Sequence, residues 1–138
     1  MPKSIKIVLA VLIGFVVWFV VATVANLLIR TSLSGYAEAE SATRFTLPML
    51  LARLAAGGLS SVAAGFACAL FVRANLAAVT ILAVALVLFF LPVHYSLWTQ
   101  FPLWYHAVFL VSLAPLVLVG ARVARLNAWG ARGAAYRR

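Results

Sequence analysis

The sequence has few charged residues and almost no acid. Only Glu38 and Glu40 are acidic among 138 residues, and 9% of all residues are charged. A soluble domain carries roughly 25% charged residues, because it has a polar surface to build. With 67% hydrophobic residues, this chain lacks the polar groups needed to cover itself. Lipid is therefore the expected environment of most of the chain.

The sequence also lacks the residues that usually carry chemistry inside a membrane. No Asp, Glu, Lys or His lies in the middle of a long apolar run, whereas pumps, proton-coupled transporters and intramembrane proteases normally retain one there. Walker loops and GxSxG and HExxH motifs are absent. The single cysteine, Cys68, excludes an intrachain disulfide and a cysteine metal cluster. These absences favour a non-catalytic protein and predict no resident cofactor.

The two acids have a spacing that does not suit a paired-carboxylate catalytic site. Residues at i and i+2 lie about 160° apart on a helix, so their side chains point away from each other there. Glu38 and Glu40 are expected in a solvated loop, with Arg30, Arg44 or Arg53 as their partners. The sequence leaves open which arginine pairs with which acid.

Four apolar segments are each long enough to cross a membrane as a helix. The hydrocarbon core is about 30 Å thick and needs about 20 helical residues. The first segment is longer than the apolar part of a signal peptide, so it is expected to be an uncleaved anchor. Pro92 is expected to end the third helix, and Pro115 to kink the fourth. The predicted helices are residues 7–29, 47–72, 76–93 and 103–121.

These segments predict an all-α fold, a four-transmembrane-helix bundle in which residues 1–138 form a single membrane domain. Four spans place both termini on one side, with eight basic residues on that side and three on the other. By the positive-inside rule both termini are cytoplasmic. The high arginine and alanine content indicates a bacterium, and hence its inner membrane. The eight are Lys3, Lys6, Arg73, Arg122, Arg125, Arg132, Arg137 and Arg138; the three are Arg30, Arg44 and Arg53.

Residues 122–138 form a basic tail that is predicted to lie in the cytosol against the membrane. Positive charges near an anionic lipid surface contribute up to about 1 kcal/mol each. The positive-inside bias accounts for the net charge of +9, so the charge alone predicts no nucleic-acid partner. An acidic cytosolic partner or ribosomal RNA is the alternative for the tail. The predicted lipid contacts are Arg122, Arg125, Arg132, Arg137 and Arg138.

Small residues recur every four positions in the second apolar segment. The repeat consists of Gly57, Ser61, Gly65 and Ala69. Small residues at this spacing let two helix backbones approach closely, and in lipid such packing drives helix association. The repeat is interpreted as an internal helix-packing surface. A seam between copies of the chain is the alternative.

The segment from His94 to His106 carries the best candidate ligand-binding residues. It reads HYSLWTQFPLWYH, with a histidine at each end. The leading interpretation is an aromatic belt at the outer membrane interface, where Trp and Tyr concentrate. A lipid or quinone headgroup site is one alternative. Another is a haem or metal site, with Glu38 or Glu40 as a third ligand. The candidate residues are His94, Tyr95, Trp98, Trp104, Tyr105 and His106.

Three functions remain open at this point. The first is an accessory subunit or assembly partner of a membrane complex, which is consistent with the small-residue repeat, the absence of charge within the spans and the basic tail. The second is a small oligomeric channel or carrier for an uncharged or lipidic solute. The third is a haem, metal, quinone or lipid-headgroup binding protein that uses His94 and His106. The expected partners are the bilayer, anionic lipids, and other membrane subunits or further copies of the chain.

Overall fold

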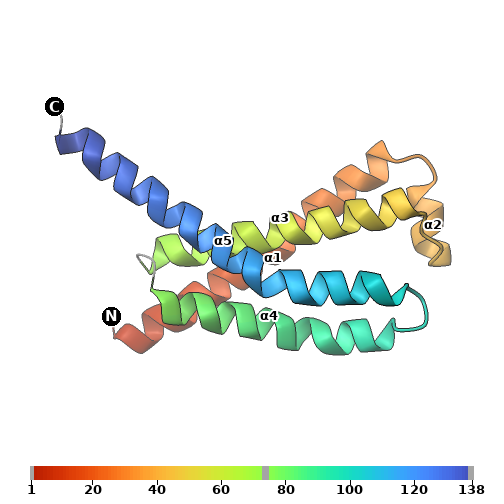
Figure 1. Cartoon of the computed structure of the whole chain (residues 1–138), viewed down its shortest axis with the longest axis horizontal. Helices are drawn as coiled ribbons and strands as arrows, with labels where there is room; N and C mark the ends of the chain where they lie inside the picture. Colours follow the sequence, from red (N-terminus) through yellow and green to blue (C-terminus); the bar gives the residue numbers. More distant parts are fainter. Residues whose placement is uncertain (1, 73–74, 137–138) are drawn as a thin grey trace.

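The computed structural model describes the backbone of residues 2–72 and 75–136, and the side chains of the same ranges up to residue 128. The described residues form helices only, in the order α1 (Lys3–Ser32), α2 (Tyr36–Ala42), α3 (Leu47–Phe71), α4 (Leu76–Ser96) and α5 (Leu103–Tyr136) (Figure 1). Four of them, all but α2, are long and apolar enough to cross a membrane. The prediction of four such helices is confirmed.

Several predicted helix ends are wrong. The first helix, predicted over residues 7–29, runs from Lys3 to Ser32. Pro92 lies inside α4, which continues to Ser96. Proline removes one backbone donor, but apolar surroundings favour keeping the remaining helical bonds intact, so a membrane helix continues past it. The fourth predicted helix does not end at residue 121, because α5 runs on to Tyr136. The segment expected as a separate tail is thus a helical continuation that extends away from the other helices in Figure 1.

Helix α5 changes direction near its middle in Figure 1, and Pro115 lies inside it. A proline in a helix interior leaves one carbonyl without a partner and clashes with the preceding turn, which bends the helix. The kink predicted at this proline therefore has its counterpart in the structure. The bend lets the first half of α5 run beside α4 while the second half crosses α3.

Helix α3 lies at the centre of the bundle and meets α5 at very short range. A Cβ atom added at Gly65 would lie 1.9 Å from the carbonyl oxygen of Val117 on α5. Across the same contact, a Cβ at Gly120 would lie 1.9 Å from the carbonyl oxygen of Val62. The two backbones touch because glycine occupies both positions. This is the close approach that small residues permit in apolar surroundings.

The other long contact of α3 is with α1. Ala10, Gly14 and Trp18 are the buried residues of α1, and they recur every four positions. A Cβ at Gly14 would lie 3.2 Å from the carbonyl oxygen of Ala64. The indole Nε1 of Trp18 donates a 3.1 Å hydrogen bond to Ser61 Oγ. Trp18 therefore faces α3, and the bond satisfies the indole donor away from water.

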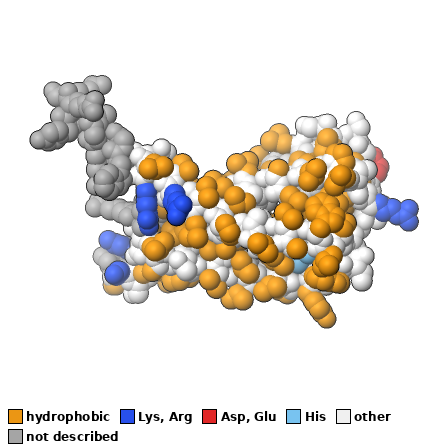
Figure 2. Space-filling model, in the orientation of Figure 1, with side chains coloured by type: hydrophobic (Ala, Val, Ile, Leu, Met, Phe, Trp, Pro, Cys, Tyr) orange, Lys and Arg blue, Asp and Glu red, His pale blue; other side chains and the backbone are white. Residues whose placement is uncertain are grey.

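The two ends of the bundle differ. Both chain termini lie at one end, and α2 and the 97–102 turn lie at the other, which we call the α2 end (Figure 1). Figure 2 shows hydrophobic side chains over the middle of the visible face, with charged side chains gathered towards both ends. Large apolar residues such as Val16, Leu59, Leu88 and Val111 are more than half exposed. An apolar girdle between charged ends is the surface expected of a helix bundle in a bilayer.

The α3–α5 contact predicts different effects of two glycine substitutions on the free energy of unfolding. Gly65→Ala should lower the free energy of unfolding by about 1–3 kcal/mol or more, because its methyl group meets backbone atoms that cannot move aside. In Gly58→Ala the nearest atom is the end of the Leu116 side chain, at 3.2 Å. This control should be neutral, or stabilising by up to about 1 kcal/mol, because it removes a glycine from a helix. Unfolding in mixed detergent–SDS micelles, followed by circular dichroism, measures both; equal effects would show that the contact is looser.

Candidate functional site

A cavity of about 210 Å³ opens among the four long helices, towards the α2 end. Most of its wall is apolar, with aromatic side chains from three helices. Five of its residues carry polar side chains, and they come from α1, α3, α4 and α5. The apolar wall includes Trp18, Ala22, Phe90, Leu97, Phe101 and Phe109; the polar residues are Asn26, Arg53, His94, Tyr105 and His106. A mainly apolar pocket with a few convergent polar groups is the usual form of a small-molecule site.

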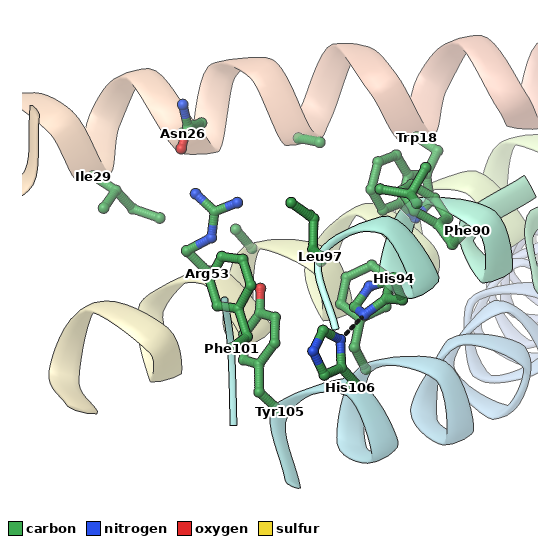
Figure 3. A pocket seen from close by; sticks show the side chains of 15 residues that line it. Trp18, Asn26, Ile29, Arg53, Phe90, His94, Leu97, Phe101, Tyr105 and His106 are labelled. Carbon is green, nitrogen blue, oxygen red and sulfur yellow. Dashed lines mark hydrogen bonds between the residues drawn. The ribbon is translucent and has the colours of Figure 1, made fainter. Parts of the chain in front are cut away.

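The two histidines of the cavity are hydrogen-bonded to each other. Nδ1 of His94 lies 2.7 Å from Nδ1 of His106 (Figure 3). Both are buried, with exposed fractions of 6% and 1%. One ring must donate and the other must accept, so at least one of the two is neutral. The aligned register of α4 and α5, joined by a short turn, brings together two residues twelve positions apart.

The second ring nitrogen of His106 has no partner. Nε2 is buried, and no atom within the described part of the chain forms a hydrogen bond with it. Figure 3 shows this nitrogen on the side of the ring away from His94, towards Tyr105. The ring is fixed by stacking with Trp98, at a centroid distance of 5.1 Å and an interplanar angle of 14°. A buried polar atom without a partner costs about 1–3 kcal/mol, so a hydrogen-bond partner for His106 Nε2 would stabilise the cavity wall.

Arg53 enters the cavity from the α2 end, where a polar network holds it. Its Nη1 donates a 2.9 Å hydrogen bond to the Tyr36 hydroxyl, which donates in turn to Asn26 Oδ1 at 3.1 Å. The Asn26 Nδ2 donates to a Glu40 carboxylate oxygen at 3.2 Å. Tyr36 is fully buried, and the left-handed backbone of Gly35 (φ 75°) turns the chain so that α2 presents it inwards.

The carboxylate of Glu40 is shared between two arginines. It lies 3.4 Å from Arg30 Nε and 3.8 Å from Arg53 Nη1. Glu38 and Arg44 are both exposed. The prediction that the acids meet basic residues is therefore confirmed for Glu40, with Arg30 and Arg53. The predicted loop is wrong at these positions, because Glu38 and Glu40 lie in helix α2. The single negative charge leaves the pair of arginines with one positive charge in excess.

The inner edge of the Arg53 guanidinium faces the cavity. Its carbon lies 4.9 Å from the centre of the Phe45 ring and 6.0 Å from that of Phe101, a cation–π arrangement. Nε is buried and has no hydrogen-bond partner among the residues described. Figure 3 shows the Tyr105 hydroxyl pointing towards this side of the guanidinium. Two buried nitrogens without partners, on Arg53 and His106, thus belong to side chains of one cavity wall.

The six residues predicted from the aromatic segment separate into two groups. His94, Tyr105 and His106 are buried and line the cavity. Tyr95, Trp98 and Trp104 are exposed, by 82%, 51% and 39%. The second group has the exposure that an interfacial belt requires. Sequence reasoning missed Asn26 and Tyr36 as neighbours of this site, although a lone Asn near the end of an apolar helix is a usable signal.

The histidine geometry does not suit a metal as it stands. Zinc–nitrogen bonds of about 2.0–2.1 Å hold two ligand nitrogens roughly 3.3 Å apart on a tetrahedral ion, whereas these two are 2.7 Å apart. Axial haem ligation needs a still wider separation. No group of three or more His, Cys, Asp and Glu residues comes together in the described ranges. Glu40 contacts Asn26 and Arg30 rather than the histidines.

The predicted packing residues all face the interior of the chain. Gly57, Ser61, Gly65 and Ala69 are buried. A Cβ at Gly57 would lie 2.8 Å from the Phe109 ring, so this glycine makes room for one wall of the cavity.

Of the predicted lipid contacts, Arg122 is exposed and Arg125 is half-buried with a partner. The side chains of Arg132, Arg137 and Arg138 lie outside the described residues.

Comparison of the chain with protein-family models, with characterised proteins and with solved structures finds no match.

The histidine pair predicts a strong coupling between two substitutions. His94→Leu or His106→Leu alone leaves a buried Nδ1 without its partner, at a cost of about 1–3 kcal/mol in unfolding free energy. The double substitution removes both polar groups and should cost less than the sum, with a coupling of about 0.5–3 kcal/mol. The control cycle pairs His106→Leu with Tyr95→Leu, whose side chain is exposed, and should be additive. Additivity in both cycles would contradict the hydrogen bond.

Proposed function

We propose that this chain is a non-catalytic, four-span membrane protein that binds one small amphipathic molecule in the cavity at its α2 end. The observation that carries the proposal is the buried, unpartnered Nε2 of His106 on a wall that is otherwise mainly apolar. Buried polar groups are nearly always hydrogen-bonded in stable structures. A ligand with a polar head and an apolar body would satisfy this nitrogen and fill the apolar space.

The floor of the cavity supports a binding pocket rather than a path through one chain. Trp18, Phe90 and Phe109 line it, with centroid distances of 4.5 Å between Trp18 and Phe90 and 5.2 Å between Phe90 and Phe109. Beyond these rings lies the continuous apolar core of the bundle, which includes Leu82 and Leu86. A solute that entered from the α2 end would meet closed aromatic packing. This favours binding over conduction within a single chain.

The charge distribution supports a position of the cavity in the outer half of the membrane. In the proposed orientation both termini are cytoplasmic and the α2 end faces the periplasm of a bacterium, because basic residues are concentrated at the end that carries the termini. The ligand would then come from the outer leaflet or from the periplasm. In this role the chain acts as an accessory protein that holds an amphiphile for a larger membrane assembly. The exposed Tyr95 and Trp98 lie beside the cavity on the outer surface.

Filling the cavity should abolish binding without unfolding the chain. Ala56 lines the cavity, and Ala56→Leu would place a larger side chain in it. Quenching of tryptophan fluorescence by an amphiphile with a brominated chain reports occupancy, because Trp18 is part of the wall. We expect saturable quenching in the natural sequence and a loss of at least about tenfold in apparent affinity in Ala56→Leu, since the space is occupied.

The matched control is Ala55→Leu, which changes the neighbouring residue on the exposed side of α3. It should bind like the natural sequence. Both variants should retain their helical circular dichroism. Equal quenching in the two variants, or no saturable quenching by any brominated amphiphile, would rule out the cavity as the binding site.

A further inference from the structure

We infer that the head of the ligand is an oxyanion, a carboxylate or phosphate, held between the Arg53 guanidinium and His106. The inference rests on the proposed function and adds the chemistry of the headgroup. Three features of the cavity support it. They are an uncompensated positive charge, nitrogen atoms without hydrogen-bond partners, and an apolar wall next to these nitrogens.

The charge balance at the α2 end favours an anion. Two guanidinium groups, of Arg30 and Arg53, share the one carboxylate of Glu40. The nearer contact of that carboxylate is with Arg30, at 3.4 Å, and Arg53 lies at 3.8 Å. Arg30 is about half exposed and is stabilised by water, whereas the Arg53 side chain is 29% exposed and faces the cavity. A half-buried cation in apolar surroundings is costly unless a negative group lies against it.

The Arg53 nitrogen without a hydrogen-bond partner is Nε, on the side of the guanidinium that faces Tyr105. Nη1 of Arg53 is bonded to Tyr36, so the tyrosine holds one edge of the guanidinium and leaves the edge with Nε facing Tyr105. Nε has no partner within the described ranges. A guanidinium edge presents two parallel N–H groups, which match the two oxygens of a carboxylate or phosphate. The Tyr105 hydroxyl lies beside that edge in Figure 3 and can donate to the same group.

His106 supplies the last donor of the set. When His94 donates from Nδ1 to Nδ1 of His106, the neutral ring of His106 carries its hydrogen on Nε2. In this tautomer Nε2 of His106 is a donor, and a ligand oxygen is the acceptor that it lacks. Arginine, tyrosine and histidine donors around one space suit an acceptor-only group. They do not suit an ammonium head, which has only donors to offer.

The apolar wall indicates what is attached to the oxyanion. Beyond the polar residues the cavity is bounded by Ala22, Phe90 and Phe109, and none of these can hydrogen-bond through a side chain. A free inorganic anion would leave this space empty. An alkyl or acyl chain would fill it and make van der Waals contacts with these side chains. The chemistry is that of a fatty acid or a single-chain phospholipid with a terminal phosphate.

A headgroup series tests the inference on the natural cavity. The substitutions Trp98→Phe, Trp104→Phe and Trp129→Phe leave Trp18 as the one tryptophan. This variant is placed in nanodiscs of zwitterionic lipid. The probes share one dibrominated chain and differ in the head: carboxylate, phosphate, alcohol and ammonium. At alkaline pH the carboxylate and phosphate probes should bind at least about tenfold more tightly than the alcohol, because a hydrogen bond to a charged group is worth more than a neutral one.

Each outcome of the series decides something. If the alcohol binds as tightly as the two anionic probes, the oxyanion inference is wrong and the proposed binding function stands. If no probe quenches Trp18, both are wrong. Inorganic phosphate and acetate are added as competitors to separate the sources of the anion. If neither anion displaces the brominated probe, the site takes a lipid. If one of them does, the site takes the soluble anion, and the ligand is still an oxyanion.

An arginine variant tests whether Arg53 recognises the negative charge of the headgroup. In Arg53→Gln the preference for the carboxylate probe over the alcohol should fall to about twofold or less, while the alcohol still binds. Retained binding of the alcohol shows that the variant has folded with its cavity intact. Arg44→Gln is the control, since Arg44 is an exposed arginine at the same end of the bundle that does not line this cavity. An unchanged preference in Arg53→Gln would overturn the assignment of Arg53.

Discussion

The close backbone contact between α3 and α5 is the constraint on which the cavity depends. Gly65 and Gly120 allow two carbonyl groups, of Val117 and Val62, to lie where side chains normally stand. That contact fixes the axial position of α5 against α3. The position of α5 in turn sets the depth at which His106 meets His94 and at which Phe109 passes Gly57. In a bilayer no hydrophobic force presses helices together, so this fit is a main source of cohesion.

The polar residues of the bundle are arranged by depth. Trp18 and Ser61 satisfy each other near the centre, the histidine pair lies further out, and the network of Tyr36, Asn26 and Glu40 lies at the α2 end. The charged groups of this series, Glu40 and Arg53, lie at the α2 end. Such a gradient suits a molecule with an apolar body and a polar head, since both parts would meet surroundings of their own kind.

Much of the architecture could be predicted from hydropathy, and most of the site could not. The four apolar runs determine the long helices, and a tryptophan at mid-span implies a polar partner such as Ser61. Pro92 was misleading because the local rule for proline gives way when water is absent. The pairing of His94 with His106 depends on the register of α4 against α5. Their separation in sequence is no motif, so only the packed structure reveals it.

Pro115 divides α5 into two parts with different neighbours. The part after the proline contains Val117 and Gly120 and is clamped against α3, while the part before it carries Tyr105 and His106 on the cavity wall. The bend therefore lies between the close α3–α5 contact and the cavity. A change in the bend angle at this proline would move the first half of α5, and with it the cavity wall, without sliding the glycine contact. A wider occupant would be admitted by rotation at one proline, without loosening the centre of the bundle.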